Sequence, residues 1–422
     1  MTTYNFDKIT NRKGTNCLKY DFAVERGKPA DVLPLWVADM DFPVSEEITK
    51  SLHAAVEHGI YGYTQPKDAY YNAVMNWMER KHNWKTEREW IVKTPGVVFA
   101  LGAAVKAFTD PGDAILIQNP VYYPFTNIIR DNDRKVVDNT LVYHSVTERT
   151  VVPVTTDDAS EQQINNVGTV SPAYQIDFED FERKIEQEHV KLFILCNPHN
   201  PVGRVWTVEE LQKLGEICLR HHVIVVSDEI HNDFVYPGYE HTVFANVDPR
   251  FAEFTLTCTA PSKTFNLAGL QISNIFIPNE NLRKAFKTEI DRTGYDEPNA
   301  LGVVACEAAY RAGEDWLDQL KAYLLKNLNF LRDFLQEKLP QIHLVEPEGT
   351  YLVWLDCSEL GITGKELDQF IVDKAGLWLD GGSMFGPDGA AFQRVNIACP
   401  QATLELALNK LKAAVEGYGN HL

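Results

Sequence analysis

Short apolar runs alternate with amphipathic stretches through the middle of this chain. Five of the runs have the length of β-strands: Ala114–Ile117, Lys191–Leu195, Val223–Val226, Thr255–Thr259 and Asn274–Ile277. Amphipathic helical patterns lie between them, for example Thr207–His221, in which Thr207 is well placed to cap the helix. Fully apolar strands that alternate with helices predict an α/β fold with a mostly parallel sheet covered by helices on both faces.

The two ends of the chain show other patterns. Residues 1–45 are irregular, and a helical period begins at about Ser45. A long helical pattern covers residues 301–339, and a strand and a last helix follow it. We therefore predict a large domain over residues 46–295 and a smaller α+β domain built from residues 1–45 and 296–422.

Charge and cysteine content exclude several classes of protein. Lys and Arg number 40 and Asp and Glu 59 among the 422 residues, so the net charge is −19, which disfavours binding to nucleic acids or to anionic membranes. The apolar runs are far shorter than the ~20 residues of a spanning helix, and the first residues lack the apolar segment of a secretory signal. The seven cysteines include no C-x-x-C pair. These features predict a reduced, cytoplasmic protein.

The segment from Ser145 to Ser171 differs in composition from the rest. It is polar and acidic and rich in Thr, Asp, Gln and Asn. We expect a surface excursion that carries no chemistry.

Common nucleotide, zinc-protease and hydrolase motifs are absent. The sequence contains no G-x-G-x-x-G after a strand, no P-loop, no H-E-x-x-H and no nucleophile elbow.

Polar clusters instead follow the predicted strands or begin a C-terminal one. Each centres on one side chain that could carry chemistry: Asn200, Asp228, Lys263 and Arg394. Because ligands bind at the carboxyl ends of parallel strands, we expect the first three to lie close together. Taken singly, each has an ordinary structural explanation. Lys263 could be a solvated surface lysine, Asp228 a helix cap or an ion-pair partner, and Arg394 part of a structural ion pair. Asp228 with His231 could suggest a metal, but no third ligand follows at a telling spacing, so no metal site is predicted.

Taken together, the four side chains suit one ligand. An aspartate opposite a protonated pyridine nitrogen and a lysine that forms a Schiff base are the protein groups that pyridoxal phosphate requires. The sequence therefore predicts a pyridoxal-phosphate enzyme.

The order Asn200, Asp228, Lys263, Arg394 resembles the fold type I pyridoxal-phosphate enzymes, the aspartate aminotransferase superfamily. More narrowly, the chain resembles their carbon–sulfur β-lyase branch, of the cystathionine β-lyase type represented by MalY and PatB. The segments that carry the resemblance are 33–43, 59–64, 94–98, 119–124, 196–206, 227–233, 262–269, 349–356 and 393–400. The resemblance implies a seven-stranded sheet and a homodimer with active sites at the subunit interface.

The resemblance also implies roles for individual cofactor-binding residues. Lys263 would bind the cofactor and act as the base at the substrate Cα, and Asp228 would keep the pyridine nitrogen protonated. Asn200 and His231 would face the phenolate oxygen of the ring, and Tyr122 would stack on the ring.

The phosphate and the substrate have their own predicted partners. Val97 and Val98 would offer amides at a helix N-terminus, which favours anions, and Ser262, with Thr259 as a further candidate, would add hydroxyls. Tyr63 would reach the phosphate of the neighbouring subunit. Arg394 would clamp the substrate α-carboxylate, helped by Ala38 and Tyr123. One departure is Gln271, where many aminotransferases place a basic residue, and it favours the lyase branch.

Three functions remain open at this point. The first is a β-lyase that cleaves L-cystathionine or related cysteine S-conjugates to pyruvate, ammonia and a thiol. The alternative is a class I/II aminotransferase on the same fold, because the same motifs serve both reactions. A third reading, a regulatory protein, is disfavoured by the intact lysine, aspartate and arginine.

Overall fold

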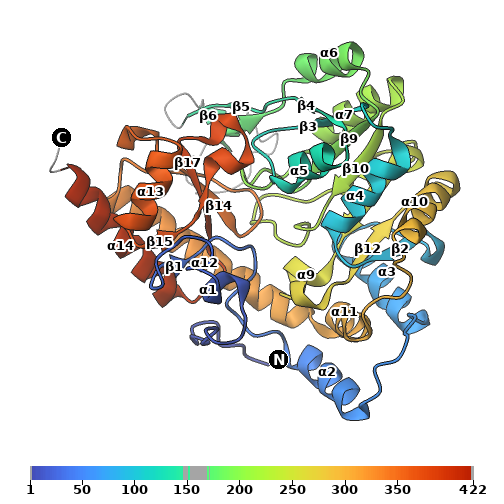
Figure 1. Cartoon of the computed structure of the whole chain (residues 1–422), viewed down its shortest axis with the longest axis horizontal. Helices are drawn as coiled ribbons and strands as arrows, with labels where there is room; N and C mark the ends of the chain where they lie inside the picture. Colours follow the sequence, from blue (N-terminus) through green and yellow to red (C-terminus); the bar gives the residue numbers. More distant parts are fainter. Residues whose placement is uncertain (1, 146–150, 153–168, 171, 420–422) are drawn as a thin grey trace, which may run out of the picture.

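The computed structural model describes residues 2–145, 151–152, 169–170 and 172–419. Its centre is a seven-stranded sheet with strand order β2-β12-β11-β10-β9-β3-β4 (Figure 1). The bounds of these strands are Ile91–Thr94 (β2), Ser273–Phe276 (β12), Thr255–Thr259 (β11), Ile224–Asp228 (β10), Leu192–Cys196 (β9), Ala114–Ile117 (β3) and Lys135–Asp138 (β4). The seven-stranded α/β fold expected from the sequence is therefore confirmed.

The direction of the strands is parallel in the middle of the sheet and reversed at one side. β10 runs parallel to both β9 and β11, and β3 runs parallel to β4 and β9. β12 is antiparallel to both of its neighbours, β11 and β2. The sequence pattern placed the strands to within about two residues, but β10 extends to Asp228, because pairing with β9 and β11 continues to that residue. Asp228 thus ends the strand instead of following it.

Helices cover both faces of this sheet. One face packs against α4 (Val97–Phe108), α5 (Pro124–Asp131) and α10 (Glu280–Arg292). The other face packs against α6 (Phe178–Glu188), α7 (Val208–Arg220) and α8 (Phe244–Val247). The apolar strands of the sequence are accordingly buried on both sides.

Local sequence signals set where two of the helices begin and end. The Ser45 hydroxyl accepts a hydrogen bond from the Ile48 N–H at the start of α2 (Glu46–His58), and Gly59 ends that helix with a φ of 70°. At the start of α7, Thr207 and Glu210 form a reciprocal capping box.

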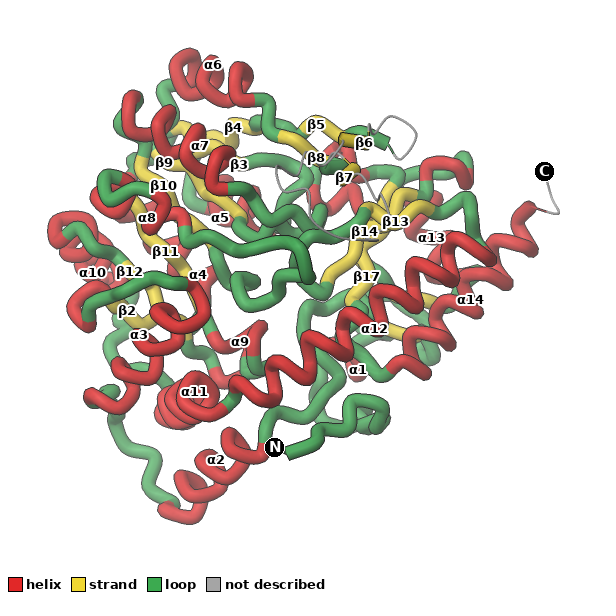
Figure 2. The backbone as a smooth tube through the Cα atoms, turned by 180° about the vertical axis from the view of Figure 1, so that it is seen from behind, coloured by secondary structure: helices red, strands yellow, loops and turns green. Residues whose placement is uncertain are grey.

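A second, four-stranded antiparallel sheet lies at the other end of the molecule. Its order is β13 (His343–Val345), β14 (Leu352–Asp356), β17 (Phe392–Asn396) and β16 (Asp380–Gly381). The long helix α12 (Glu314–Lys338) runs alongside it with α14 (Gln401–Gly419), as Figure 2 shows. The division at residues 45 and 296 stays a prediction.

The remaining elements connect or flank these two sheets. In the N-terminal segment, which the sequence left irregular, a short helix and a strand form, and β1 pairs parallel with β15. Residue 313 separates α11 from α12, as the pattern predicted. The bounds are Leu18–Asp21 (α1), Asp68–His82 (α3), Pro261–Thr264 (α9), Ala300–Ala312 (α11), Lys365–Asp373 (α13), Leu33–Pro34 (β1), Val142–Tyr143 (β5), Val151–Val152 (β6), Thr169–Val170 (β7), Tyr174–Gln175 (β8) and Leu377–Trp378 (β15).

Two sequence expectations concern membranes and the polar segment. Within the ranges given above, no helix is both long enough and apolar enough to cross a bilayer. In the polar segment 145–171, β6 pairs antiparallel with β7, and most of the other residues lie outside the described ranges. The expectation of a surface excursion without chemistry is therefore not tested.

Candidate active site

A cavity of about 180 Å³ lies at the carboxyl ends of β9, β10 and β11, and we call it the first cavity. Nine of the thirteen predicted site residues line it: Ala38, Val97, Val98, Tyr122, Asn200, Asp228, His231, Ser262 and Lys263. They come from segments more than 200 residues apart in the sequence, so the fold assembles the site. The prediction that the strand-end residues lie close together is confirmed.

Lys263 lies in the one-turn helix α9, which directly follows β11. Its Nζ donates a hydrogen bond to the Ala38 carbonyl oxygen at 2.8 Å. Burial, with the nearby Arg394 charge, lowers the pKa of Lys263 to about 8, although Asp39 and Asp228 act in the opposite direction. A lysine with this pKa holds a substantial fraction of neutral amine near pH 7–8, which is the form that attacks carbonyls and accepts protons.

Asp228 is a buried carboxylate without a cationic partner. It is 5% exposed, and its Oδ1 accepts one hydrogen bond, from the Ile230 N–H at 3.2 Å. No lysine, arginine or histidine of the described ranges lies within ion-pair distance of it. Burial raises the pKa of Asp228 to about 7, and the hydrogen bond and the Lys263 charge only partly offset this. A buried carboxylate of this kind calls for a ligand cation.

The N-terminus of α4 opens on the same cavity. The helix begins at Val97 after Gly96, and no side chain caps this end. Ser262 also lines this cavity. The first amides of a helix lack intrahelical acceptors and carry the positive end of the helix dipole, so this wall suits an anionic group.

Three further side chains complete the wall. Burial lowers the pKa of His231 well below its ordinary value, so the imidazole is neutral, and its Nδ1 has no hydrogen-bond partner in the described structure. Asn200 is 3% exposed. Burial raises the pKa of Tyr122, which therefore stays a neutral phenol.

Arg394 lies behind this wall instead of lining it. It stands inside β17, is 3% exposed, and donates from Nη1 to Asn200 Oδ1 at 3.0 Å. From Nη2 it donates to the Trp36 carbonyl oxygen at 3.0 Å and forms an ion pair with Asp380, its partner residue on β16. The sequence reasoning missed Asp380, because an ion pair across two strands leaves no local signal.

Other predicted residues lie outside the first cavity. Tyr63 is 94% exposed, and Tyr123 lines a neighbouring cavity. The Thr259 hydroxyl donates to the Asn274 carbonyl oxygen at 3.1 Å, so it is already engaged within the sheet. Gln271, the departure noted in the sequence, is exposed.

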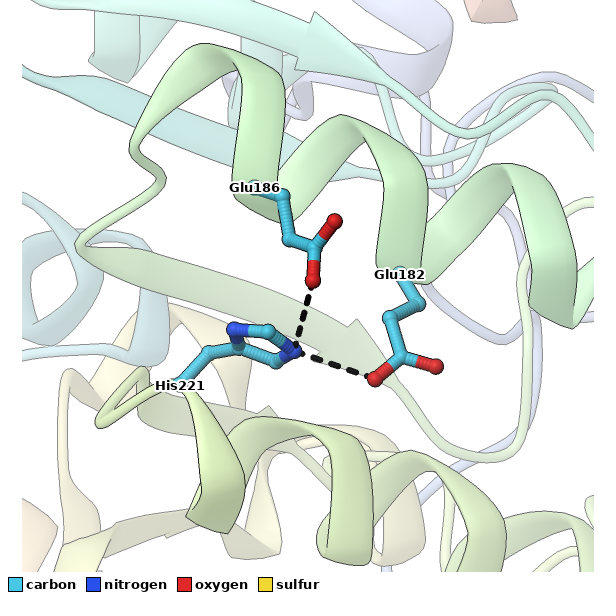
Figure 3. A group of neighbouring side chains, drawn as sticks. All are labelled: Glu182, Glu186 and His221. Carbon is cyan, nitrogen blue, oxygen red and sulfur yellow. Dashed lines mark hydrogen bonds and ion pairs between the residues drawn. The ribbon is translucent and has the colours of Figure 1, made fainter.

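One group of side chains elsewhere has the composition of a metal site. Glu182 and Glu186 of α6 converge on His221, whose Nε2 lies 3.0 Å from Glu182 Oε1 and 3.8 Å from Glu186 Oε1 (Figure 3). Arg220 also donates to Glu182 Oε1, at 2.5 Å. The arginine already supplies positive charge here, and the group is part of a surface ion-pair network.

Comparison with known proteins agrees with this geometry. The profile of the family "Aminotransferase class I and II" matches residues 30–411. Cystathionine beta-lyase PatB of Bacillus subtilis is 44% identical over 411 residues, 97% of this chain and 100% of that protein. Protein MalY of Escherichia coli is 30% identical, over 98% and 99% of the two chains.

A solved structure gives the same result at the level of the fold. Cystalysin from Treponema denticola, whose crystal structure contains pyridoxal 5'-phosphate, superimposes with a TM-score of 0.89 and is 36% identical. The match covers 99% of this chain and all of that one. The chain therefore belongs to the aminotransferase class I and II family of pyridoxal-phosphate enzymes.

Proposed function

We propose that the protein is a pyridoxal-phosphate-dependent carbon–sulfur β-lyase that cleaves L-cystathionine or related cysteine S-conjugates to pyruvate, ammonia and a thiol. The observation that carries the proposal is that Lys263 and Asp228 line one cavity, with Arg394 bonded to its wall residue Asn200, in a chain 44% identical to a cystathionine β-lyase. The aminotransferase alternative shares the family profile and must be separated by experiment.

The residues of the first cavity fit pyridoxal phosphate by charge. Asp228, buried without a cation, suits the protonated ring nitrogen, and the uncapped N-terminus of α4 suits the phosphate. We assign Val97, Val98 and Ser262 to the phosphate. The amine of Lys263 suits the aldehyde.

The other wall residues would fix the ring. Asn200 can direct its amide N–H to the phenolate oxygen, because its carbonyl oxygen is held by Arg394. His231, neutral and unpartnered at Nδ1, can assist at the same oxygen. Tyr122 would lie against the ring face, a role that its neutral phenol permits.

The chemistry divides between the ligand and the chain. When bound, pyridoxal phosphate supplies an aldehyde for the substrate amine and a ring that accepts electrons from the substrate Cα. Arg394 binds the α-carboxylate and thereby orients the Cα–H bond, and Ala38 offers a backbone group beside it. Lys263 then removes the Cα proton through Nζ. Loss of the thiolate from Cβ completes the elimination, since a thiolate is a good leaving group, and water then hydrolyses the released aminoacrylate to pyruvate and ammonia.

We also propose a homodimer and a cytoplasmic location. Tyr63 supports the dimer, because a side chain that is 94% exposed and remote from its own cavity is free to enter a neighbour's site. The seven cysteines support the location, because all of them are described and all are free thiols.

Pyruvate release tests the function directly. The protein loaded with cofactor is mixed with L-cystathionine in the absence of any keto acid. We expect many turnovers of pyruvate per site, lost in Lys263→Ala and retained in Lys106→Ala, which removes a surface lysine of α4. A single turnover that stops until a keto acid is added would instead establish the aminotransferase.

A further inference from the structure

A second cavity, of about 240 Å³, is lined by residues of β15, β16 and α13 together with side chains of the N-terminal segment. The side chains that matter for its chemistry are Arg26, Lys28, Trp36, Tyr123, Asp368 and Asp380. Among them, Tyr123 is predicted from the sequence to contact the substrate.

The side chain of Arg394 separates the second cavity from the first. Its Nη1 donates to Asn200, which lines the first cavity, and its Nη2 pairs with Asp380, which lines the second. The rings of Tyr122 and Tyr123, one from each cavity, are 5.5 Å apart between centroids. A substrate whose α-carboxylate binds Arg394 therefore stands at the boundary of the two cavities.

The second cavity presents charges of both signs around an aromatic surface. Trp36 and Trp378 are stacked with centroids 4.4 Å apart, and the Arg26 guanidinium lies 5.2 Å from the Trp36 ring. Neither Arg26 nor Lys28 has a carboxylate within ion-pair distance in the described ranges. Their charges are thus available to a ligand, whereas Asp380 is the acid on the inner side.

The pKa of the Tyr123 hydroxyl responds to charged groups of both signs around the second cavity. Burial raises the pKa of Tyr123 and the Asp380 charge raises it further, while the charges of Arg394 and Arg26 lower it. Acidic and basic groups therefore act on one point in the cavity. A ligand part that is itself a zwitterion complements such a surface.

Resting on the proposed function, we propose that the second cavity binds the far end of a thioether substrate and selects those whose far end is itself an α-amino acid. Arg26, with Lys28, recognises the distal carboxylate, and Asp380 with Asp368 faces the distal ammonium. Trp36 and Tyr123 contact the carbon–sulfur chain between the two ends. L-cystathionine has this form, whereas simple S-alkyl cysteines do not.

Three substrates separate recognition of the far end from catalysis. L-cystathionine carries both distal charges, S-(2-carboxyethyl)-L-cysteine carries only the distal carboxylate, and S-ethyl-L-cysteine carries neither. The variant is Arg26→Gln, with Lys28→Gln as the second and Arg292→Gln as a matched control. The Arg292 side chain is 71% exposed and belongs to α10, which lines neither cavity.

In Arg26→Gln we expect kcat/KM to fall about tenfold for the two substrates with a distal carboxylate, mainly through KM, and to stay unchanged for S-ethyl-L-cysteine. Lys28→Gln should give a smaller effect of the same kind, and Arg292→Gln none. Equal losses on all three substrates, or no loss on any, would overturn the assignment. Pyruvate release from S-ethyl-L-cysteine by the unmodified protein would still uphold the lyase, so the two proposals can fail separately.

Discussion

Replacing Asp228 by asparagine should have opposite effects on the protein without cofactor and with it. Without cofactor, the buried carboxylate has no cationic partner among the described residues, and burial raises its pKa to about 7 from the ordinary 3.8. Because the folded-state value is the higher one, ionisation opposes folding. The penalty is absent below pH 3.8, grows as the pH rises from 3.8 to 7, and is constant above that.

The size of the effect follows from this difference. The rise of the Asp228 pKa from 3.8 to about 7 corresponds to a penalty of about 4 kcal/mol at pH 8, of which only about 1–2 kcal/mol has developed at pH 5. For a chain of 422 residues, the entropy of unfolding is roughly 0.9 kcal/mol/K, so 4 kcal/mol corresponds to about 4–5 °C in Tm. Cofactor-free Asp228→Asn should therefore melt higher than the unmodified protein, and more so at pH 8 than at pH 5.

Pyridoxal phosphate should reverse the order. The carboxylate gains its cation when the protonated ring nitrogen binds, and asparagine cannot supply that charge. Thermal melts at both pH values, with and without saturating cofactor, measure all four states. Asp356→Asn is the matched control, because Asp356 is a buried strand-end carboxylate that accepts hydrogen bonds from Tyr143 and Ser358 outside both cavities.

Two results would contradict this reasoning. If the advantage of cofactor-free Asp228→Asn did not grow between pH 5 and pH 8, the carboxylate would not be destabilised by burial. If the variant bound the cofactor as tightly as the unmodified protein, Asp228 would not face the ring nitrogen.

Three further predictions concern other parts of the molecule. The rate of cofactor uptake should rise with pH and level off above pH 8, since the pKa of Lys263 is lowered to about 8 and the neutral amine reacts; stopped-flow absorbance measures it. Arg394→Lys should lower kcat/KM about 100-fold and also lower Tm, because one ammonium cannot replace a guanidinium that bonds Asn200 through Nη1 and the buried Asp380 through Nη2. Gly215→Ala should cost about 1–3 kcal/mol of unfolding free energy in denaturant titrations, since a Cβ there would lie 2.1 Å from Phe251, whereas Gly417→Ala meets nothing.

The site could largely be predicted because its chemistry follows strand ends. Asn200, Asp228 and Lys263 each come at the end of an apolar run, and the carboxyl edge of a parallel sheet brings such positions together. The roles predicted for Val97 and Val98 came from the family resemblance, and the structure places a helix start at Val97. The strand ends therefore indicated Asn200, Asp228 and Lys263, and the family resemblance supplied the other candidate residues.

The features that could not be predicted depend on the register between paired strands and on the direction in which a strand runs. Asp380 pairs with Arg394 because β16 and β17 place them opposite each other, and nothing local to either residue announces this. Tyr123 follows Tyr122 directly, yet the two rings line different cavities. β12 is as buried as the parallel strands although it runs antiparallel, so its direction could not be predicted from its apolar run.

The position of Asp228 makes β10 intolerant of changes in length. Ser227 and Glu229 hydrogen-bond to each other on one side of the strand, and Glu229 also contacts His241, while Asp228 points to the first cavity. β10 is paired on both edges, so the strand could not slide to compensate for a residue deleted within it. Such a deletion would place Glu229 where Asp228 now faces the cavity. Evolution of this enzyme can therefore vary loops on either side of β10, but it can add or remove residues within the strand only by losing the site.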